Sequence, residues 1–458
     1  MKLLIKGRRM GIIALGLFIA VTVILNTLAK RDIAESLLIA LVCIAFLGGT
    51  QGPSMFWQAI RDASQSEVTF AGMAFVFMGI IVQATGLVDR LIEILNSIFG
   101  RVRGGAAYVS TLSSGLIGLM AGSTAGNSAT VGSVTIPWMK KSGWSSERAA
   151  TVVAGNSGLG VALPPNSTMF IILALPAAAG ASASSVYVAL ACGGAYAVIY
   201  RLIVIFWLTR REGIKAASRD ERTSLGHAVK HGWSSPSIFI GIIIPVILTV
   251  GPVAGYLAKE SAIGENGVKA ISIIVWVPIL ITLIALIEGA WRIRQNNINL
   301  AVQFRQDLPQ FATVGISLFS ALAAANIMEQ LGVGEQLSGL LNGMNLPGWL
   351  MVLIVGILAV LVATPLSSTA TAAAIGAPAV AALSSVGIDP TTAIVVILLC
   401  TSTEGASPPV GAPIYLSAAL AEADPPKMFV PLIVYFVLPM ILLAWLIGMG
   451  LLPIYVPS

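Results

Sequence analysis

Long apolar runs separated by short polar connections make up most of the chain. An α-helix needs about 20 apolar residues to cross a bilayer. Continuous apolar runs that suit such helices cover residues 10–28, 33–47, 68–96, 183–208, 236–258, 268–290, 309–341 and 427–453. Two further apolar segments, 149–179 and 391–421, are interrupted by polar residues and proline pairs. The pattern predicts an all-α, polytopic membrane protein with about 10 transmembrane helices.

Composition supports this class and excludes others. Of the 458 residues, 57% are hydrophobic and only 10% are charged, which is far from the composition of a soluble domain. The net charge of +6 comes from Lys and Arg in short loops, as expected for loops on the cytoplasmic side, and does not indicate a nucleic-acid partner. The chain starts with basic residues and a long apolar run, which we interpret as the first span and not as a cleaved signal peptide.

The two halves of the chain contain an internal repeat. Equivalent residues keep a separation of 244 positions, as in the pairs Ser123 and Ser367, Gly132 and Gly376, Gly143 and Gly387, and Pro164 and Pro408. A fixed separation over several landmarks indicates two copies of one structural unit. Interrupted hydrophobic segments at matching positions of two repeats point to the binding site of a transporter.

Each repeat contains a polar-centred stretch that is too short for two full spans. Residues 104–139 have Arg101 and Arg103 before them and Lys140 and Lys141 after them. Two spans and a turn need about 40 residues or more. We therefore expect a re-entrant hairpin with both ends on the cytoplasmic side and its tip near the middle of the bilayer. Its counterpart, residues 347–385, has no basic residue at either end and should enter from the opposite face.

A broken helix follows each hairpin. Proline removes a backbone donor and clashes with the preceding turn, so Pro164-Pro165 and Pro408-Pro409 should interrupt segments 149–179 and 391–421. Broken helices expose amide and carbonyl groups at mid-membrane, which is tolerated only inside protein or beside a solvated cavity.

These elements give two repeats of five crossings and one hairpin each. An odd number of crossings predicts that the repeats are inverted relative to each other. We assign residues 1–208 to the first repeat, 209–233 to a basic cytoplasmic loop, and 234–458 to the second repeat. Two polar segments, 51–67 and 291–308, are predicted to be interfacial helices.

Oxygen-bearing residues gather at the hairpin tips and helix breaks, where they could bind a cation. In the first half these candidates are Ser123 and Asn127 at the tip and Asn156, Ser157 and the carbonyls near Gly160 at the break. In the second half they are Ser367, Ser368 and Thr369 at the tip and Thr401, Ser402 and Glu404 at the break. An anionic substrate would lie between the tips, near Asn127, Thr130, Asn166, Thr371 and Ser407.

Close helix packing is the alternative explanation of these stretches. Gly, Ala, Ser and Thr at short spacing allow membrane helices to approach each other without any ligand. Two such stretches at one fixed offset, each followed by a proline pair, favour a site. Glu404 is the most specific single candidate. A carboxylate inside a membrane span costs free energy and is usually retained for a function. It could bind a cation, carry a proton, or simply reach water through the helix break.

At these residues the sequence resembles a known family, the large membrane subunit of TRAP (tripartite ATP-independent periplasmic) transporters. The resemblance covers nearly the whole chain. It is carried by RGGAAYVSTLSSGLIGLMAGSTAGNSATVGSVTIPWMKKSGW at the first hairpin, by NSGLGVALPPNSTM at its broken helix, and by VGIDPTTAIVVILLCTSTEGASPPVGAPIYLSAALA in the second half.

The resemblance implies a sodium-driven, elevator-type importer of organic acids in the bacterial inner membrane. It also implies a small four-helix membrane subunit and a periplasmic substrate-binding protein that delivers a carboxylate. Carried onto this chain, the family's sodium sites involve the Ser123 region with Asn156, Ser157, Gly160 and Pro164, and the Ser367–Ser368 region with Thr401 to Glu404.

The chain departs from the family pattern at three places. The family usually has an aspartate where this chain has Asn127, another where it has Ser367-Ser368, and commonly a glycine at Glu404. Proton coupling is therefore an alternative to sodium. A stand-alone anion symporter of the same architecture is an alternative to a binding-protein-dependent one. A membrane enzyme is disfavoured, because no metal-protease motif, Ser/His/Asp constellation or nucleophile elbow is visible.

Overall fold

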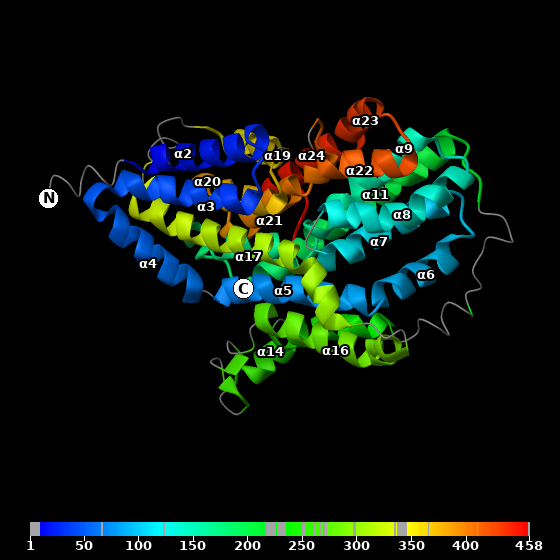
Figure 1. The fold of residues 1–458 in the computed structure, drawn as a ribbon, viewed down its shortest axis with the longest axis horizontal. Helices are drawn as coiled ribbons and strands as arrows, with labels where there is room; N and C mark the ends of the chain where they lie inside the picture. Colours follow the sequence, from blue (N-terminus) through cyan, green and yellow to red (C-terminus); the bar gives the residue numbers. More distant parts are fainter. Residues whose placement is uncertain are drawn as a thin grey trace.

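The computed structural model describes residues 10–456 except 66, 122–123, 217–225, 227–234, 250–251, 260–261, 265–266, 269–270, 272, 296–298, 334–335, 337–345, 365 and 410. All regular elements in these ranges are helical, and no strand occurs among them (Figure 1). The predicted all-α fold is therefore confirmed for the part of the chain described.

In the first half, the elements follow in this order: α2 (Gly11–Val23), η1 (Ile24–Leu28), α3 (Ile33–Ala45), η2 (Phe46–Gln51), α4 (Gly52–Gln65), α5 (Glu67–Ala84), α6 (Leu87–Phe99), α7 (Gly105–Ala121), α8 (Thr124–Lys141), α9 (Ser146–Asn156), η3 (Ser157–Gly160), α10 (Ser167–Leu173), η4 (Pro176–Ala178) and α11 (Ala183–Arg211). The third apolar run, 68–96, is interrupted in the structure, because Gly86 separates α5 from α6 with a φ of 66°.

In the second half, the elements are η6 (Ser235–Phe239), α13 (Ile240–Thr249), α14 (Pro252–Leu257), α16 (Ile273–Gln295), α17 (Leu300–Gln330), α19 (Gly348–Ala363), α20 (Ser368–Ser385), α21 (Pro390–Thr401), η7 (Glu404–Ala406), α22 (Ala412–Ala421), α23 (Pro425–Leu432), η8 (Ile433–Val437) and α24 (Leu438–Gly448). The hairpin regions therefore contain the helix pairs α7/α8 and α19/α20, and in each pair the two helices pack against each other.

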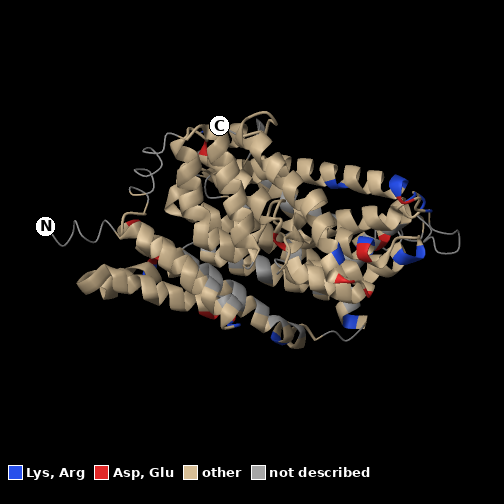
Figure 2. Ribbon diagram, turned by 90° about the horizontal axis from the view of Figure 1, so that it is seen from above, with Lys and Arg blue, Asp and Glu red and all other residues tan. Residues whose placement is uncertain are grey.

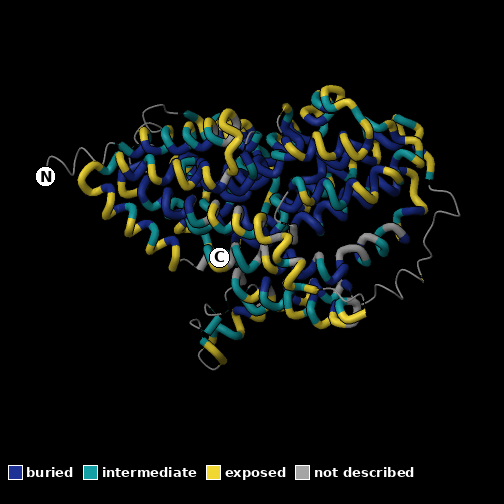
Figure 3. Tube along the Cα trace, viewed as in Figure 1, coloured by how far each residue is buried: buried dark blue, intermediate teal, exposed yellow. Residues whose placement is uncertain are grey.

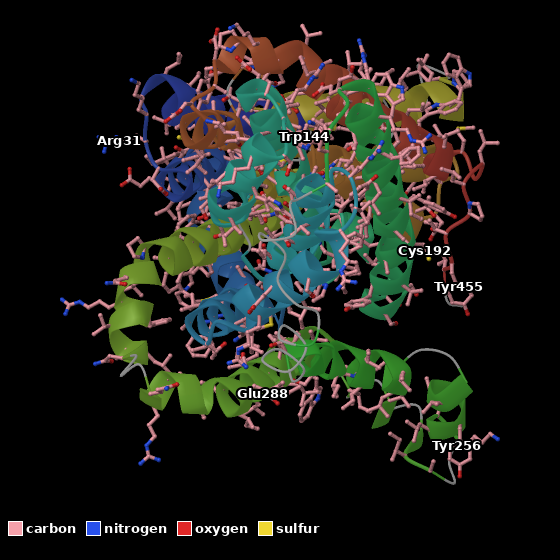
Figure 4. All side chains as sticks on the ribbon, turned by 90° about the vertical axis from the view of Figure 1, so that its right-hand side faces the viewer. Arg31, Trp144, Cys192, Tyr256, Glu288 and Tyr455 are labelled. Carbon is pink, nitrogen blue, oxygen red and sulfur yellow. The ribbon has the colours of Figure 1, made fainter. Side chains whose placement is uncertain are left out.

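The helices form two groups that differ in burial. An inner bundle consists of α7 to α11 and α19 to α24. An outer group consists of α2 to α5, α13, α16 and α17, which pack mainly on one another. Helix α16, marked by Glu288, lies apart from the inner bundle in Figure 4, and the outer helices carry many exposed residues in Figure 3. Contacts of α17 with α20 and of α5 with α10 join the two groups.

The two helices that lead into the breaks lie at the centre of the inner bundle. Every residue from Ala149 to Asn156 in α9 is buried, and in α21 only Pro390 and Thr392 are not. A helix with apolar or small side chains on every face is stable only when other elements pack around all of it. The charged residues instead gather mostly at the ends of the helices, as Figure 2 shows.

Within the described ranges, three helical stretches are long and apolar enough to cross a membrane by length and composition: Ala34–Gln65, Ala183–Arg211 and Pro425–Gly448. Large apolar side chains are exposed along α11, for example Ile199, Ile203, Phe206 and Trp207. Such a surface suits contact with lipid and would be unfavourable in water.

One of the two predicted interfacial helices is wrong as a separate element. Residues 52–65 do form α4, with Met55, Ala59 and Ala63 buried along one side. In the region 291–308, however, α16 continues to Gln295 and α17 begins at Leu300. Asn299 ends the interruption because its side chain accepts hydrogen bonds from the backbone N–H groups of Ala301 and Val302. The polar stretch thus supplies the ends of two long helices.

The first hairpin and the first helix break approach each other backbone to backbone. A Cβ atom on Gly160 would lie 2.1 Å from the carbonyl carbon of Gly118, which no packing arrangement allows. Glycine at both positions therefore holds α7 against η3. This contact fixes the position along α7 at which the helix break meets the first hairpin.

We expect Gly160→Ala to lower the melting temperature (Tm) of the purified protein in detergent. Forcing a methyl group into a packed interior costs about 1–3 kcal/mol, and here the obstacle is backbone, which cannot swing away. Gly16→Ala in α2 is the matched control, because nothing lies within 4 Å of a Cβ atom at that position. Equal Tm values for the two variants would contradict the contact.

Candidate ion and substrate site

Glu404 lies at the break of the second broken helix and accepts hydrogen bonds from both hairpins. Its Oε1 accepts from Thr124 Oγ1 at 2.7 Å. Its Oε2 accepts from the backbone N–H of Ser368 at 2.6 Å and from Ser368 Oγ at 2.6 Å. Thr124 is the first residue of α8 and Ser368 is the first residue of α20. One carboxylate therefore joins the two hairpin tips to a helix break.

The electrostatic setting of this carboxylate is favourable. Free N–H groups and the helix dipole stabilise negative charge at a helix N-terminus, where Ser368 and Thr124 both lie. A charged side chain near the bilayer centre costs about 2.5–3.5 kcal/mol on insertion scales. Hydrogen bonds to charged groups contribute about 1.5–3 kcal/mol each, so three of them can offset that cost.

Two further contacts hold the N-terminus of α20 next to Glu404. Ser367 caps the helix, because its hydroxyl oxygen accepts a hydrogen bond from the backbone N–H of Ala370. Ser368 Oγ lies 3.0 Å from the carbonyl oxygen of Thr401, in addition to its contact with Glu404. The tip of the second hairpin is thus bound to the end of α21 as well as to the carboxylate.

The first half forms a matching set of contacts around Asn127. Its Nδ2 donates to the carbonyl oxygens of Ser114 at 2.9 Å and Ser157 at 2.8 Å. Asn156 Nδ2 donates to Thr111 Oγ1 at 2.8 Å. The Oδ1 atoms of Asn127 and Asn156 are buried and have no hydrogen-bond partner among the described residues. Two buried amide oxygens without donors are suitable cation ligands, since a buried acceptor is costly when left unpaired.

The two helix breaks touch each other. A Cβ atom on Gly158 would lie 1.8 Å from the carbonyl oxygen of Ser402, and a Cβ atom on Gly405 would lie 1.9 Å from Ser157 Oγ. Only glycine permits such close approach, which is to backbone at Gly158 and to a side chain at Gly405. The structure therefore brings Ser157, Ser402 and Glu404 from the two repeats into one region.

Other residues predicted for ion binding have local roles in the described structure. The hydroxyl groups of Ser157, Thr401 and Ser402 donate to carbonyl oxygens of the preceding helical turn. Gly160 belongs to η3, and Pro164 lies in the turn that separates η3 from α10. Both proline pairs interrupt their segments, which confirms the two predicted breaks. Ser123 lies outside the described residues.

The residues predicted to bind the substrate are less closely associated. Thr371 Oγ1 donates to the carbonyl oxygen of Ser367, and Ser407 Oγ donates to that of Thr403. Asn166 caps α10 by accepting from Met169 N, and its Nδ2 donates to the carbonyl oxygens of Val161 and Leu163. Thr130 lies half-buried on α8. These side chains support the breaks and the tips. Among the described residues, none of their side chains is hydrogen-bonded to the Glu404 carboxylate, and only the backbone N–H of Ser407 donates to the Glu404 carbonyl oxygen, at 3.3 Å.

Sequence reasoning did not identify Thr124, although a signal was present. Thr124 and Ser368 are 244 positions apart, the offset of the repeat, so the two residues that bind Glu404 are equivalent. Glu404 in turn is equivalent to Gly160, where the backbone of Gly118 leaves no room for a side chain. The site is therefore built from symmetric tips but carries one carboxylate, in the second half only.

Broken helices that meet inside a helical membrane protein, with hairpin tips bound between them, define the chain as a membrane transporter. Residues 15–449 match the family described as "Tripartite ATP-independent periplasmic transporter, DctM component". The chain therefore belongs to the large permease subunits of TRAP transporters. It is a multi-pass membrane protein and not an enzyme.

Several curated relatives agree with this family. The chain is 27% identical over 202 residues to the "C4-dicarboxylate TRAP transporter large permease protein DctM" of Pseudomonas aeruginosa, covering 44% of this chain and 45% of that protein. It is 20% identical over 398 residues to the "Sialic acid TRAP transporter large permease protein SiaM" of Vibrio cholerae, covering 86% and 87%. For the first relatives, the matches span about half the length of the curated protein.

Solved structures show a similar fold. The Alcanivorax borkumensis YdaH transporter superposes with a TM-score of 0.61 at 16% identity, covering 88% of this chain and 89% of that one. MtrF of Neisseria gonorrhoeae superposes with a TM-score of 0.59 at 13% identity, covering 87% and 84%. The helical membrane architecture predicted from the sequence is confirmed by these neighbours.

We expect Glu404→Ala to destabilise the protein more than Glu404→Gln. Alanine removes every acceptor from the Ser368 N–H and the Thr124 hydroxyl, and a buried donor without a partner costs about 1–3 kcal/mol. Glutamine keeps one oxygen for Ser368, and its amide can donate to Thr124 Oγ1. Thermal unfolding of the two purified variants measures the difference. If both variants had the wild-type Tm, the hydrogen bonds that join the two tips through Glu404 would make no contribution to stability.

Proposed function

We propose that the chain imports an organic acid across the bacterial cytoplasmic membrane, driven by a sodium gradient. A periplasmic binding protein delivers the acid, and a small four-helix membrane subunit braces the outer helices. The observation that carries this proposal is the bridge from Glu404 to Thr124 and Ser368, because it makes one site from both hairpins and a helix break.

The division into an inner bundle and an outer group supports an elevator motion. The tips, the breaks and Glu404 all belong to the inner bundle, whose central helices α9 and α21 are buried on nearly every side. The outer group has its own packing contacts and could remain fixed while the inner bundle slides. In such a motion the site would move as one body, so its internal hydrogen bonds would persist.

Cation binding has two candidate positions. In the first half, the buried Oδ1 atoms of Asn127 and Asn156 would bind a sodium ion with the other ligands predicted from the sequence, Ser123, Ser157, Gly160 and Pro164. In the second half, the carboxylate of Glu404 would act with Ser367, Ser368, Thr401 and Ser402. A proton at Glu404 is the alternative coupling ion, since the family's usual aspartates are replaced at Asn127 and Ser367-Ser368.

The substrate class rests on the relatives and on the residues near the tips. The names of curated relatives refer to C4-dicarboxylate, isethionate, 2,3-diketo-L-gulonate and sialic acid, all of which are organic acids. An anionic group would be bound by the hydroxyl and amide donors of Asn127, Thr130, Asn166, Thr371 and Ser407, after local rearrangement of their present contacts. The alternative is a stand-alone anion symporter of the same architecture.

We expect Glu404→Gln to lower gradient-driven uptake at least tenfold in proteoliposomes that hold the chain with its small membrane subunit and are supplied with the periplasmic binding protein. The substitution removes the negative charge of the side chain but keeps its shape. A tenfold loss of uptake corresponds to about 1.4 kcal/mol of free energy. Ser133→Ala is a matched control, because Ser133 is exposed on α8 and its hydroxyl bonds only the carbonyl oxygen of Thr130. Wild-type uptake by Glu404→Gln would remove Glu404 from the mechanism.

Imposing sodium and pH gradients separately identifies the coupling ion. Sodium coupling predicts accumulation with an inward sodium gradient at equal pH on both sides, and none with a pH gradient alone. The opposite result would assign a proton to the transport cycle. Accumulation with neither gradient would contradict secondary transport.

Purification of the tagged chain from its native membranes tests the partners. The proposal predicts that a small membrane protein co-purifies in near-equal amount, and that the binding protein associates when its acid is present. Recovery of the chain alone, in a form that still transports, would favour the stand-alone symporter.

A further inference from the structure

An exposed apolar stripe on α11 ends at an arginine, and the transport site does not use it. Ile199, Ile203 and Phe206 are 54%, 58% and 49% exposed, and Arg210 is exposed as well. These residues are spaced by four, three and four positions, so they follow one side of the helix. At 1.5 Å per residue the stripe is about 16 Å long, which is close to half of a hydrocarbon core of about 30 Å.

The two arginine side chains at the end of α11 turn back along the helix. Arg210 Cζ lies 4.3 Å from the centre of the Phe206 ring, and Arg211 Cζ lies 4.9 Å from that of Trp207. Side chains on a helix point toward its N-terminus, which favours contacts between residues four apart. The Trp207 ring also lies 5.7 Å from that of Tyr435 in η8. Trp and Tyr are enriched at the membrane surface, so both positive charges are held where the apolar stripe meets that surface.

The two guanidinium groups have no counter-charge among the described residues. No salt bridge there includes Arg210 or Arg211, and the adjacent carboxylate of Glu212 is paired with Arg148 at 2.7 Å. A guanidinium group donates hydrogen bonds in its own plane, so contact of its face with a ring leaves its N–H groups available. The end of the stripe thus presents N–H donors and two positive charges beside an apolar surface.

We propose that Arg210, Arg211 and the stripe from Ile199 to Phe206 bind an anionic phospholipid. The phosphate accepts hydrogen bonds from the two guanidinium groups, because arginine matches the geometry of phosphate oxygens. One acyl chain covers the stripe, whose length suits the hydrocarbon depth of one leaflet. The inference rests on the position of α11 in the membrane and does not depend on the transported substrate or the coupling ion.

Other ligands fit this surface less well. A zwitterionic phospholipid brings an ammonium group toward the same two cations, so its net electrostatic attraction is weaker. A soluble phosphate would contact the arginine side chains but would leave the apolar stripe uncovered.

Thermal unfolding of the purified full-length protein tests the site. The protein in neutral detergent receives phosphatidylglycerol or phosphatidylcholine with the same acyl chains, and the Tm is followed as the lipid increases. A ligand that binds only the folded state raises the Tm in a saturable manner. We expect phosphatidylglycerol to raise the Tm by about 2 °C more than phosphatidylcholine does. Arg210→Gln combined with Arg211→Gln should remove this difference, because it removes both charges from exposed positions.

Lys141→Gln combined with Lys215→Gln is the matched control. Both lysine residues are exposed, and the backbone N–H of Lys215 donates to the carbonyl oxygen of Ser142 at 3.3 Å, next to Lys141. Among the described residues, neither lysine lies over an aromatic ring. This control removes the same amount of charge beside the end of α11, and it should keep the full difference between the two lipids.

Three results would overturn the proposal. Equal Tm rises of the wild-type protein with the two lipids would show that the headgroup charge is not recognised. Loss of the difference in both double variants would show general attraction of charge and no defined site. An equal rise with glycerol 3-phosphate in place of the lipid would overturn the assignment to a phospholipid.

Native mass spectrometry supplies a second measurement that does not depend on unfolding. After incubation with equal amounts of both lipids, the wild-type protein should retain an additional phosphatidylglycerol molecule compared with the Arg210→Gln, Arg211→Gln variant. Equal retention by the two proteins would contradict the proposal. Neither experiment involves transport, so failure of the lipid site and failure of the proposed function are distinguishable.

Discussion

The hydrogen bonds that hold the Glu404 carboxylate are the constraint on which the rest of the inner bundle depends. A carboxylate inside a bundle of membrane helices is tolerable only when donors surround it, and the donors come from Thr124 at one hairpin tip and Ser368 at the other. Both tips must therefore end at the break that carries Glu404. The glycine contacts at Gly158 and Gly405 follow from the same requirement, because the two breaks can share one site only if their backbones touch.

The surrounding helices provide the packing that keeps these polar groups in place. Helices α9 and α21 lead into the breaks and are buried on nearly every side, so the breaks cannot shift without disrupting the core. One salt bridge and one hydrogen bond at the helix ends add a further connection between the repeats, since Lys140 at the base of the first hairpin donates to the carbonyl oxygen of Ala421 and pairs with Glu422. These contacts join elements from both halves into one bundle, which is the property that an elevator motion needs.

Much of this architecture could be predicted from the sequence, because it depends on local chemistry and on symmetry. Proline pairs break helices wherever they occur, and the offset of 244 positions revealed the repeat without any knowledge of contacts. The repeat offset pairs Thr124 with Ser368, but the hydrogen bond from Thr124 to Glu404 could not be predicted, since it depends on which side chains face each other after folding. The polar stretch 291–308 was misassigned for a related reason: Asn299 and its neighbours end two long helices, and a sequence pattern does not distinguish that arrangement from a short surface helix.

Cross-linking of the two hairpin tips tests the central claim most directly. Thr124→Cys and Ser368→Cys would be combined after replacement of Cys43, Cys192 and Cys400, with a protease site inserted in the 209–233 loop. Because both tips bind one carboxylate, mercuric ion should bridge the two thiols, so that the cleaved halves stay together on a denaturing gel while either single cysteine variant separates. Separation of the halves in the double variant, with both thiols shown to react with mercury, would contradict the convergence of the two tips on Glu404.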